Sequence, residues 1–304
     1  SGLVLIDKPS GWTSHDVVAR LRKIAGTRRV GHAGTLDPMA TGLLVLGVDG
    51  GTKLLQFISG SDKQYIATIR LGAATHTDDA EGEIISTASA ASVTLEQIDA
   101  EIAKLTGAIT QIPSSVSAIK VDGKRAYDLV RDGKEVELKG REVTVSQFKR
   151  TSEIRSVGDY LDFDVVVDCS SGTYIRALAR DIGSALAVGG HLTMLRRVAT
   201  GPFDASQCMT LDALEALPEH ERADHLLPVQ SLLTGHETVT LDAEHAGRFL
   251  SGVRRRGDWP DHERVAVYGP PLEGFHDPVL LGTAHTRGGE LIPGRLLSPT
   301  DIQH

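Results

Sequence analysis

The alternation of apolar and polar residues predicts a chain in which strands and amphipathic helices follow one another. The clearest strand is residues 160–169, YLDFDVVVDC, where polar and apolar side chains alternate with a period of two. Related patterns predict strands at residues 3–6, 43–48, 63–72 and 190–200. Helices are predicted at residues 16–25, 52–58, 95–105, 177–186 and 210–217, with Thr13 or Ser14 capping the first, Gly26 ending it and Thr94 capping the third.

The last part of the chain has a different pattern. Residues 218–235 contain acids, prolines and a glycine, which predicts a linker. Short strand patterns follow at residues 237–241, 264–268, 279–284 and 290–292. We therefore expect a separate, compact and β-rich unit at the end of the chain, with three consecutive arginines at 254–256 exposed.

One loop stands out for its chemistry. The stretch RVGHAGTLDPMATG at residues 29–42 combines three glycines, one proline and a single carboxylate, that of Asp37. Glycines so close together predict a tight loop or a backbone that a ligand approaches closely. The strand predicted at residues 43–48 follows directly, so the loop would be anchored on a sheet. An Asp-Pro pair in a loop is also a common turn, which on composition alone is the simpler interpretation.

Charge changes this picture in one place. The formal net charge of -8 argues against a polyanionic partner such as nucleic acid. Yet five basic residues lie between positions 20 and 29, and the chain has no acid from residue 18 to residue 36. The approach to the Asp37 loop is therefore locally basic, and a one-sided basic face remains possible.

Composition also bounds the compartment and the size. A chain of 304 residues with 40% hydrophobic residues has room for one large domain or for a large and a small one. Cys169 and Cys208 form neither a disulfide framework nor a zinc site. No apolar run is long enough to cross a bilayer, and the first residues do not resemble a signal peptide. We expect a cytoplasmic protein.

Two segments invite a functional interpretation. Residues 75–82, THTDDAEG, place a histidine near acids, but loop spacing is unconstrained, so a solvated turn is favoured over a metal site. Residues 111–150 are poor in apolar side chains and rich in lysine and arginine, which predicts mobility without a ligand.

The remaining candidates are isolated residues. Tyr174 and Arg176 lie where a predicted strand meets a helix N-terminus, a place favourable for anions. Lys53 lies in the first turn of another predicted helix and is either solvated or directed at a phosphate. Phosphate loops of the Gly-Lys-Ser/Thr type, nucleophile elbows and dinucleotide fingerprints are absent from the sequence.

A family resemblance unites these features. Residues 31–44, GHAGTLDPMATGLL, together with LIDKP at 5–9, resemble the signature of the TruB family of tRNA pseudouridine-55 synthases. Further matches in the family's order lie at residues 63–65 with 71–72, 77–82, 111–113 with 117–120, 169–176 and 195–197. The resemblance covers residues 3 to about 217.

The resemblance implies a fold and a domain organisation. The fold is α+β, with a mixed, mostly antiparallel central sheet flanked by helices and loops. Residues 1–225 would form the catalytic domain, with a mobile thumb insert at about 114–142 that closes over the RNA. Residues 236–304 would form a small β-rich C-terminal RNA-binding domain of the PUA-like type.

The resemblance also implies an activity. Family members isomerise uridine 55 in the T-arm loop of tRNA to pseudouridine by flipping the base out of its stack. They need neither a cofactor nor a metal, because the base stays in the site throughout. The implied partner is the T-arm stem-loop of tRNA, with no membrane and no protein partner, so a monomer is expected.

Carried over position by position, three residues take catalytic roles. Asp37 corresponds to the family's nucleophile. Arg176 corresponds to its charge-assisted partner. Tyr65 corresponds to the aromatic residue over the flipped base and is a candidate for handling the proton at carbon 5.

Four further positions correspond to substrate contacts. Tyr174 and Leu195 would line the pocket, His32 would contact the RNA loop where the base had been, and Lys53 would meet a backbone phosphate. Two other hypotheses remain open. One is an RNA-binding or chaperone module that acts without chemistry, and the other is a nucleotide-dependent enzyme whose glycine loop binds phosphates.

Overall fold

The computed structural model describes residues 1–114, 120–121, 124–125 and 139–303. Side chains are described for all of these except the residues at 120–121, 124–125 and 303. Most of the predicted thumb at 114–142 lies outside the described residues. The expected mobility of this segment therefore stays a prediction.

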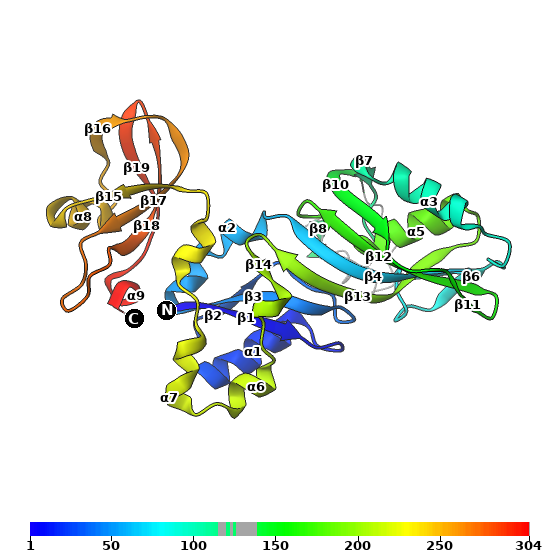
Figure 1. The fold of residues 1–304 in the computed structure, drawn as a ribbon. Helices are drawn as coiled ribbons and strands as arrows, with labels where there is room; N and C mark the ends of the chain where they lie inside the picture. The colour runs from blue at the N-terminus through cyan, green and yellow to red at the C-terminus, as the bar shows by residue number, and fades with distance from the viewer. Residues whose placement is uncertain (115–119, 122–123, 126–138, 304) are drawn as a thin grey trace.

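A ten-stranded mixed sheet forms the centre of the larger part of the molecule (Figure 1). Its main path runs in the order β1, β3, β13, β4, β12, β10 and β7, while β2 pairs with β3, β11 with β12 and β14 with β13. The pairing of β3 with β13 is parallel and the others in this sheet are antiparallel, which confirms the predicted mixed, mostly antiparallel sheet. The strands are β1 Gly2–Lys8, β2 Val30–Ala33, β3 Thr41–Val48, β4 Lys63–Leu71, β7 Gly107–Gln111, β10 Arg141–Arg150, β11 Arg155–Val157, β12 Tyr160–Cys169, β13 Gly190–Thr200 and β14 Phe203–Asp204.

Smaller ladders lie beside this sheet. They pair β5 Ala73–Thr75 with β6 Ile84–Thr87, and β8 Lys120–Val121 with β9 Lys124–Arg125.

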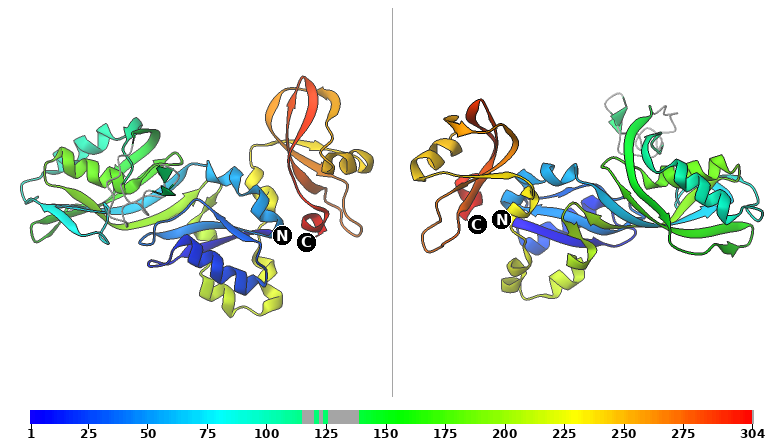
Figure 2. Two further views of the ribbon diagram at one scale, coloured as in Figure 1. Left: turned by 180° about the vertical axis from the view of Figure 1, so that it is seen from behind. Right: turned by 45° about the horizontal axis from the view of Figure 1, so that its top comes forward.

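Helices cover the sheet at two places, as the views in Figure 2 show. Helices α3 and α5 lie over the end formed by β4, β10, β12 and β13, while α1 and α6 lie beside β1 and β2. Alternating burial along β4 places its odd-numbered side chains from Tyr65 to Leu71 in the core with Leu178 and Ile182 of α5, which are fully buried. The helices are α1 Ser14–Ala25, α2 Gln56–Ser59, α3 Leu95–Lys104, α5 Ile175–Ala185, α6 Leu211–Ala216 and α7 Glu219–Arg222.

Two predicted elements differ from the structure. The helix expected at residues 52–58 is a 3-10 segment, η1 Asp49–Leu54, followed by the short α2. The backbone at Gly51 passes so close to β1 that a Cβ there would lie 2.3 Å from the Gly2 carbonyl oxygen. Gly50 and Gly51 also disfavour a regular helix. The predicted linker at 218–235 contains the short helix α7 and two 3-10 segments, η3 Ala223–His225 and η4 Val229–Leu233. It also buries Leu232 and Leu233, so it is packed against the rest of the protein.

The predicted β-rich unit is present at the end of the chain. Its five-stranded sheet runs in the order β15, β17, β18, β19 and β16, and Val265, Val267 and Phe249 lie in its own core. A second core, which includes Leu280 and Leu297, joins this unit to β1, β3 and η1 of the larger sheet. Its elements are β15 Glu237–Thr240, α8 Ala243–Leu250, β16 Arg255–Trp259, β17 His262–Gly269, β18 Val279–Arg287, β19 Gly289–Leu296 and α9 Pro299–Gln303. Among the described residues, no helix has the length and apolar character needed to cross a membrane.

Candidate active site

The loop that carries Asp37 is fixed from several sides. It joins β2 to β3, and the Ser14 hydroxyl at the start of α1 accepts from the Leu36 N–H and donates to the Leu36 carbonyl. The buried Lys8 ammonium donates to the carbonyls of Trp12 and Pro38, at 2.6 and 3.2 Å. Burial lowers the pKa of Lys8 to about 8, although the charge of Asp37 opposes that change. The loop is therefore held in one position before any ligand arrives.

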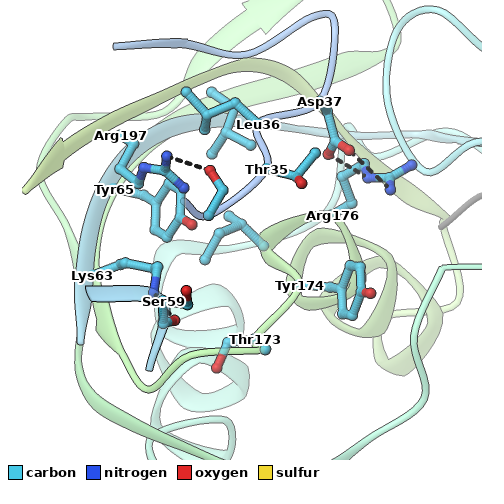
Figure 3. A pocket seen from close by; sticks show the side chains of 14 residues that line it. Thr35, Leu36, Asp37, Ser59, Lys63, Tyr65, Thr173, Tyr174, Arg176 and Arg197 are labelled. Carbon is cyan, nitrogen blue, oxygen red and sulfur yellow. Dashed lines mark hydrogen bonds and ion pairs between the residues drawn. The ribbon is translucent and has the colours of Figure 1, made fainter. Parts of the chain in front are cut away.

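Arg176 pairs with the Asp37 carboxylate, as Figure 3 shows. The Arg176 Nε lies 3.0 Å from Asp37 Oδ2, and Nη2 donates to Oδ1 at 3.5 Å. The Arg176 side chain is 5% exposed, while that of Asp37 is 36% exposed. The cation is thus buried behind a carboxylate whose other side faces the solvent, where a substrate can reach it.

A second carboxylate lies behind the same arginine. Arg176 Nη1 donates to the Thr77 carbonyl at 3.0 Å and lies 3.9 Å from Asp79 Oδ2. Asp79 in turn accepts from the Thr77 hydroxyl at 2.6 Å and from the Glu81 N–H at 3.0 Å. The prediction of a solvated turn at residues 75–82 was therefore wrong at Asp79, because that aspartate is buried.

The neighbouring Asp78 is also buried, 3.4 Å from Arg180 Nη1. Burial raises the pKa of Asp78, and the Arg180 charge opposes this rise. The described residues include no group of three or more histidines, cysteines and acids placed to hold a metal ion. Both aspartates serve to hold arginines of α5.

Tyr65 and Arg197 form the opposite wall. They are direct cross-strand partners, on β4 and β13 respectively. Arg197 is 1% exposed, and its guanidinium donates to the carbonyls of Leu43 at 2.9 Å and Gly34 at 2.7 Å. Burial raises the pKa of Tyr65, whereas the charge of Arg197 and a hydrogen bond from it act in the opposite direction.

Arg197 was seen in the sequence only as part of a motif. Its function in the site depends on the register between β4 and β13, which the sequence does not display. The close approach of β13 to β3 requires a glycine at position 42, since a Cβ there (φ +104) would lie 2.2 Å from the Arg197 carbonyl oxygen.

These groups enclose a pocket of about 220 Å³. It brings together five of the seven residues expected in the site, namely Asp37, Tyr65, Tyr174, Arg176 and Leu195, and adds Lys63 and Arg197 among others. The start of α5 is fixed by Gln111, whose side-chain amide bonds to both the N–H and the carbonyl of Tyr174. Burial lowers the pKa of Lys63 to about 8, and its ammonium donates to the carbonyls of Ser59 and Ser61.

His32 and Lys53 lie outside the lining of this pocket. His32 is on β2, and burial lowers its pKa. Lys53 Nζ lies 2.8 Å from Asp301 Oδ2 of α9, and Arg29 Nη1 lies 2.8 Å from the other oxygen of that carboxylate. Burial acts to raise the pKa of Asp301, but hydrogen bonds from these two cations and from Ser298 outweigh it and lower that pKa.

Comparison with known proteins identifies the class. The family model described as "TruB family pseudouridylate synthase (N terminal domain)" matches residues 22–175, and the "tRNA pseudouridylate synthase B C-terminal domain" matches residues 176–234. The protein is thus a pseudouridine synthase, an isomerase. Within this class, the chain belongs to the TruB family.

Individual relatives agree. A tRNA pseudouridine synthase B of Streptomyces griseus subsp. griseus is 52% identical over 276 residues, covering 88% of this chain and 90% of the relative. Another, from Leifsonia xyli subsp. xyli, is 59% identical and covers 89% of each chain. A third, from Arthrobacter sp. (strain FB24), is 58% identical and covers 76% of this chain and 78% of its own length.

Solved structures support the fold. The archaeal box H/ACA sRNP Nop10-Cbf5 complex contains a chain with a TM-score of 0.70 and 20% identity, covering all of this chain and 88% of the other. An H/ACA RNP bound to a substrate RNA gives a TM-score of 0.68 at 22% identity, covering 99% and 86%. The expected α+β fold with a small PUA-like C-terminal domain is confirmed.

Proposed function

We propose that this enzyme converts uridine 55 in the T-arm loop of tRNA to pseudouridine, with Asp37 as the nucleophile and without a cofactor. The observation that carries the proposal is the ion pair of Asp37 and Arg176 at the mouth of a pocket walled by Tyr65 and Leu195. The relatives named tRNA pseudouridine synthase B support tRNA as the substrate.

The reaction is balanced without any other reactant. The bond from N1 of uracil to C1′ of the ribose breaks, a bond from C5 to C1′ forms, C5 loses a proton and N1 gains one. A single carboxylate is sufficient as the nucleophile. Arg176 directs that carboxylate through a charge-assisted pair, and its own position is fixed by Asp79 and Thr77.

The pocket fits a base removed from its stack. Flipping a uridine out of an RNA loop costs a few kcal/mol, which contacts in the pocket must offset. Tyr65 presents an aromatic ring and a hydroxyl for the base and for the proton at C5, and Tyr174 and Leu195 add further surface. His32 would contact the vacated RNA loop, and Lys53 would exchange Asp301 for an RNA phosphate.

The same binding surface supports an accompanying role in tRNA folding, because flipping the base opens and then releases the T-arm loop. The enzyme would act as a monomer in the cytoplasm. The two free cysteines suit a reducing compartment.

The test is Asp37→Asn, assayed by chemical mapping of pseudouridine in a T-arm stem-loop and by RNA-binding titration. We expect conversion to be lost while the Kd changes by less than about threefold, because the two side chains have nearly the same size. The matched control is Asp164→Asn, which removes a partly exposed carboxylate paired with Arg155 outside the pocket. Turnover by Asp37→Asn at the unmodified rate would contradict the assignment of the nucleophile.

A further inference from the structure

Two buried cations, Lys63 and Arg197, line the catalytic pocket beside Tyr65. Lys63 is 8% exposed, although it is a lysine at the first position of a strand. Both side chains pack against Gly34, since a Cβ there would lie 3.4 Å from Arg197 Nη1 and 3.6 Å from Lys63 Cε. Figure 3 shows the two cations on the Tyr65 side of the pocket, away from the Asp37 carboxylate. The steps assigned to Asp37 and its arginine use neither of them.

The hydrogen bonds of these cations hold them in place without cancelling their charge. The Lys63 ammonium donates to the carbonyls of Ser59 and Ser61, at 3.0 and 2.7 Å. The Arg197 guanidinium likewise donates to two backbone carbonyls. Within the described parts of the chain, neither cation forms an ion pair with a carboxylate. An ammonium has three N–H groups, so Lys63 keeps one beyond the two that these carbonyls accept.

The acidic groups near Lys63 leave its charge largely uncompensated. Asp62 is exposed, so water screens its carboxylate. Burial raises the pKa of the Cys169 thiol to about 11, so this group is neutral at pH 7. Burial and the charge of Arg197 lower the pKa of Lys63 to about 8, which still leaves the ammonium mostly protonated at pH 7. The Tyr65 side of the pocket therefore carries two positive charges that act on any anion placed there.

The isomerisation itself produces such an anion. When the bond from N1 of uracil to C1′ breaks, its electron pair stays with the ring, and uracil becomes a monoanion delocalised over N1, O2, C5 and O4. If Asp37 adds to C6 before that bond breaks, the negative charge falls on C5 and O4 of the same ring. The electron pair returns to C1′ when the bond from C5 forms. C5 then loses its proton and N1 gains one, so the product ring is neutral.

We propose that Lys63 and Arg197 stabilise the negative charge that develops on the uracil ring, with the remaining N–H of Lys63 donating to a ring oxygen and Arg197 acting through its charge. The inference rests on the proposed function, because it takes uracil as the ring in the pocket. Both cations are already buried and held by carbonyls, so they need no rearrangement when the charge appears. Asp37 would then act at one side of the pocket and the cations at the other.

The test measures how fast Lys63→Met and the unmodified protein consume the target nucleoside in single-turnover assays. Two T-arm stem-loops are compared, one with uridine and one with 5-fluorouridine at the target position. Fluorine makes the ring more acidic, so the anion depends less on an external cation. We expect Lys63→Met to lower the saturating rate about 100-fold on uridine but only about tenfold on 5-fluorouridine. The protein concentration at half-maximal rate should change by less than about threefold, because the interaction forms in the transition state.

The matched control is Lys104→Met, which removes an exposed lysine of α3 that pairs with Glu101 outside the pocket. Its rates on both stem-loops should equal those of the unmodified protein. Lys63→Gln is a second variant, whose amide can still donate to the Ser59 carbonyl. It carries the same comparison of substrates if a thermal melt shows that Lys63→Met is unfolded at the assay temperature.

The outcomes are separable. A loss of the same factor on both stem-loops would show that Lys63 maintains the shape of the pocket without stabilising charge on the ring, and the inference would be overturned. It would also be overturned if the Lys63 variants kept the saturating rate of the Lys104→Met control on uridine. Failure of the unmodified protein to form pseudouridine from uridine would instead refute the proposed function. In an active enzyme, only the ratio between the two substrates decides the role of Lys63.

Discussion

Replacing Arg176 separates its two tasks, which are to direct Asp37 and to neutralise Asp79. Arg176→Lys keeps a positive charge but loses the planar fork that reaches Asp37, Thr77 and Asp79 together. Arg176→Met keeps the length of the side chain but removes the charge. The two variants should therefore differ in stability even if both lose activity.

The magnitudes follow from distance and burial. At 3.0 Å, two unit charges attract by about 5 kcal/mol at an effective dielectric constant of 20, and the 36% exposure of Asp37 reduces the net value. Asp79 is only 5% exposed, so Arg176→Met leaves a buried carboxylate without its cation, at a cost of about 3 kcal/mol or more. Arg176→Lys should cost about 1 kcal/mol. A carboxylate misplaced by an ångström loses about 100-fold in rate, so we expect at least that loss for both variants.

Urea unfolding measures the free energy of unfolding, and single-turnover formation of pseudouridine in a T-arm stem-loop measures the rate. The matched control is Arg180→Lys, which changes an arginine one turn further along α5 that pairs with Asp78 and lies outside the pocket lining. Its rate should stay within about threefold of the unmodified value. An Arg176→Lys enzyme with an unchanged rate, or an Arg180→Lys enzyme as slow as Arg176→Lys, would refute the reasoning.

The cost of the buried carboxylate has its own test. Adding Asp79→Asn to Arg176→Met removes the uncompensated charge. The double variant should therefore lose about 2 kcal/mol less free energy of unfolding than the two single variants lose together. Additive losses would show that Asp79 and Arg176 are not coupled.

Other expectations concern buried charges elsewhere. Arg197→Met should cost about 2 kcal/mol and raise the pKa of Tyr65 further, because the opposing charge is gone; ¹³C NMR of the tyrosine ring would show this, and a fall in that pKa would contradict it. The folded-state pKa of Asp301 is lowered, so its stabilisation is present above about pH 4 and is lost as pH falls; Asp301→Asn should cost about 2 kcal/mol at pH 7 and progressively less in acid unfolding curves. The pKa of Lys8 is about 8 when folded and 10.5 when unfolded, so between these values the unfolded state binds more protons and stability rises with pH. Lys8→Met should remove this rise, which amounts to about 3 kcal/mol, and equal slopes for both proteins would contradict the lowered pKa of the buried lysine.

The sequence predicted those elements that local signals determine. Helix α1 has the Thr13 capping box and ends at Gly26 in the left-handed conformation, so chemistry within a few residues set both ends. Strand β12 follows its alternating pattern over the full predicted range of 160–169. The segment after β3 could not be predicted in the same way, because the close approach of Gly51 to β1 comes from the tertiary structure.

The site shows the same division. Sequence similarity placed Asp37, Tyr65, Tyr174, Arg176 and Leu195, and the structure brings all five to one pocket. No local pattern indicated that Asp79 is buried, because the cation that pairs with it, Arg176, is 97 positions away in the chain, on α5. From its position in the sequence, Lys53 was expected to be either solvated or directed at a phosphate. In the structure its ammonium forms an ion pair with Asp301 of α9.

These missed contacts share a physical cause that bears on how the site works. Each is a charge whose partner is supplied by an element distant in sequence, so neither residue of the pair carries a local pattern. For Asp37 the consequence is a chain of support, in which Gln111 fixes the start of α5, Asp79 fixes Arg176, and Arg176 fixes the carboxylate. A change at Gln111, which lines no part of the pocket, should therefore lower the rate of pseudouridine formation by moving Arg176, while leaving Tyr65 on the opposite wall of the pocket in place.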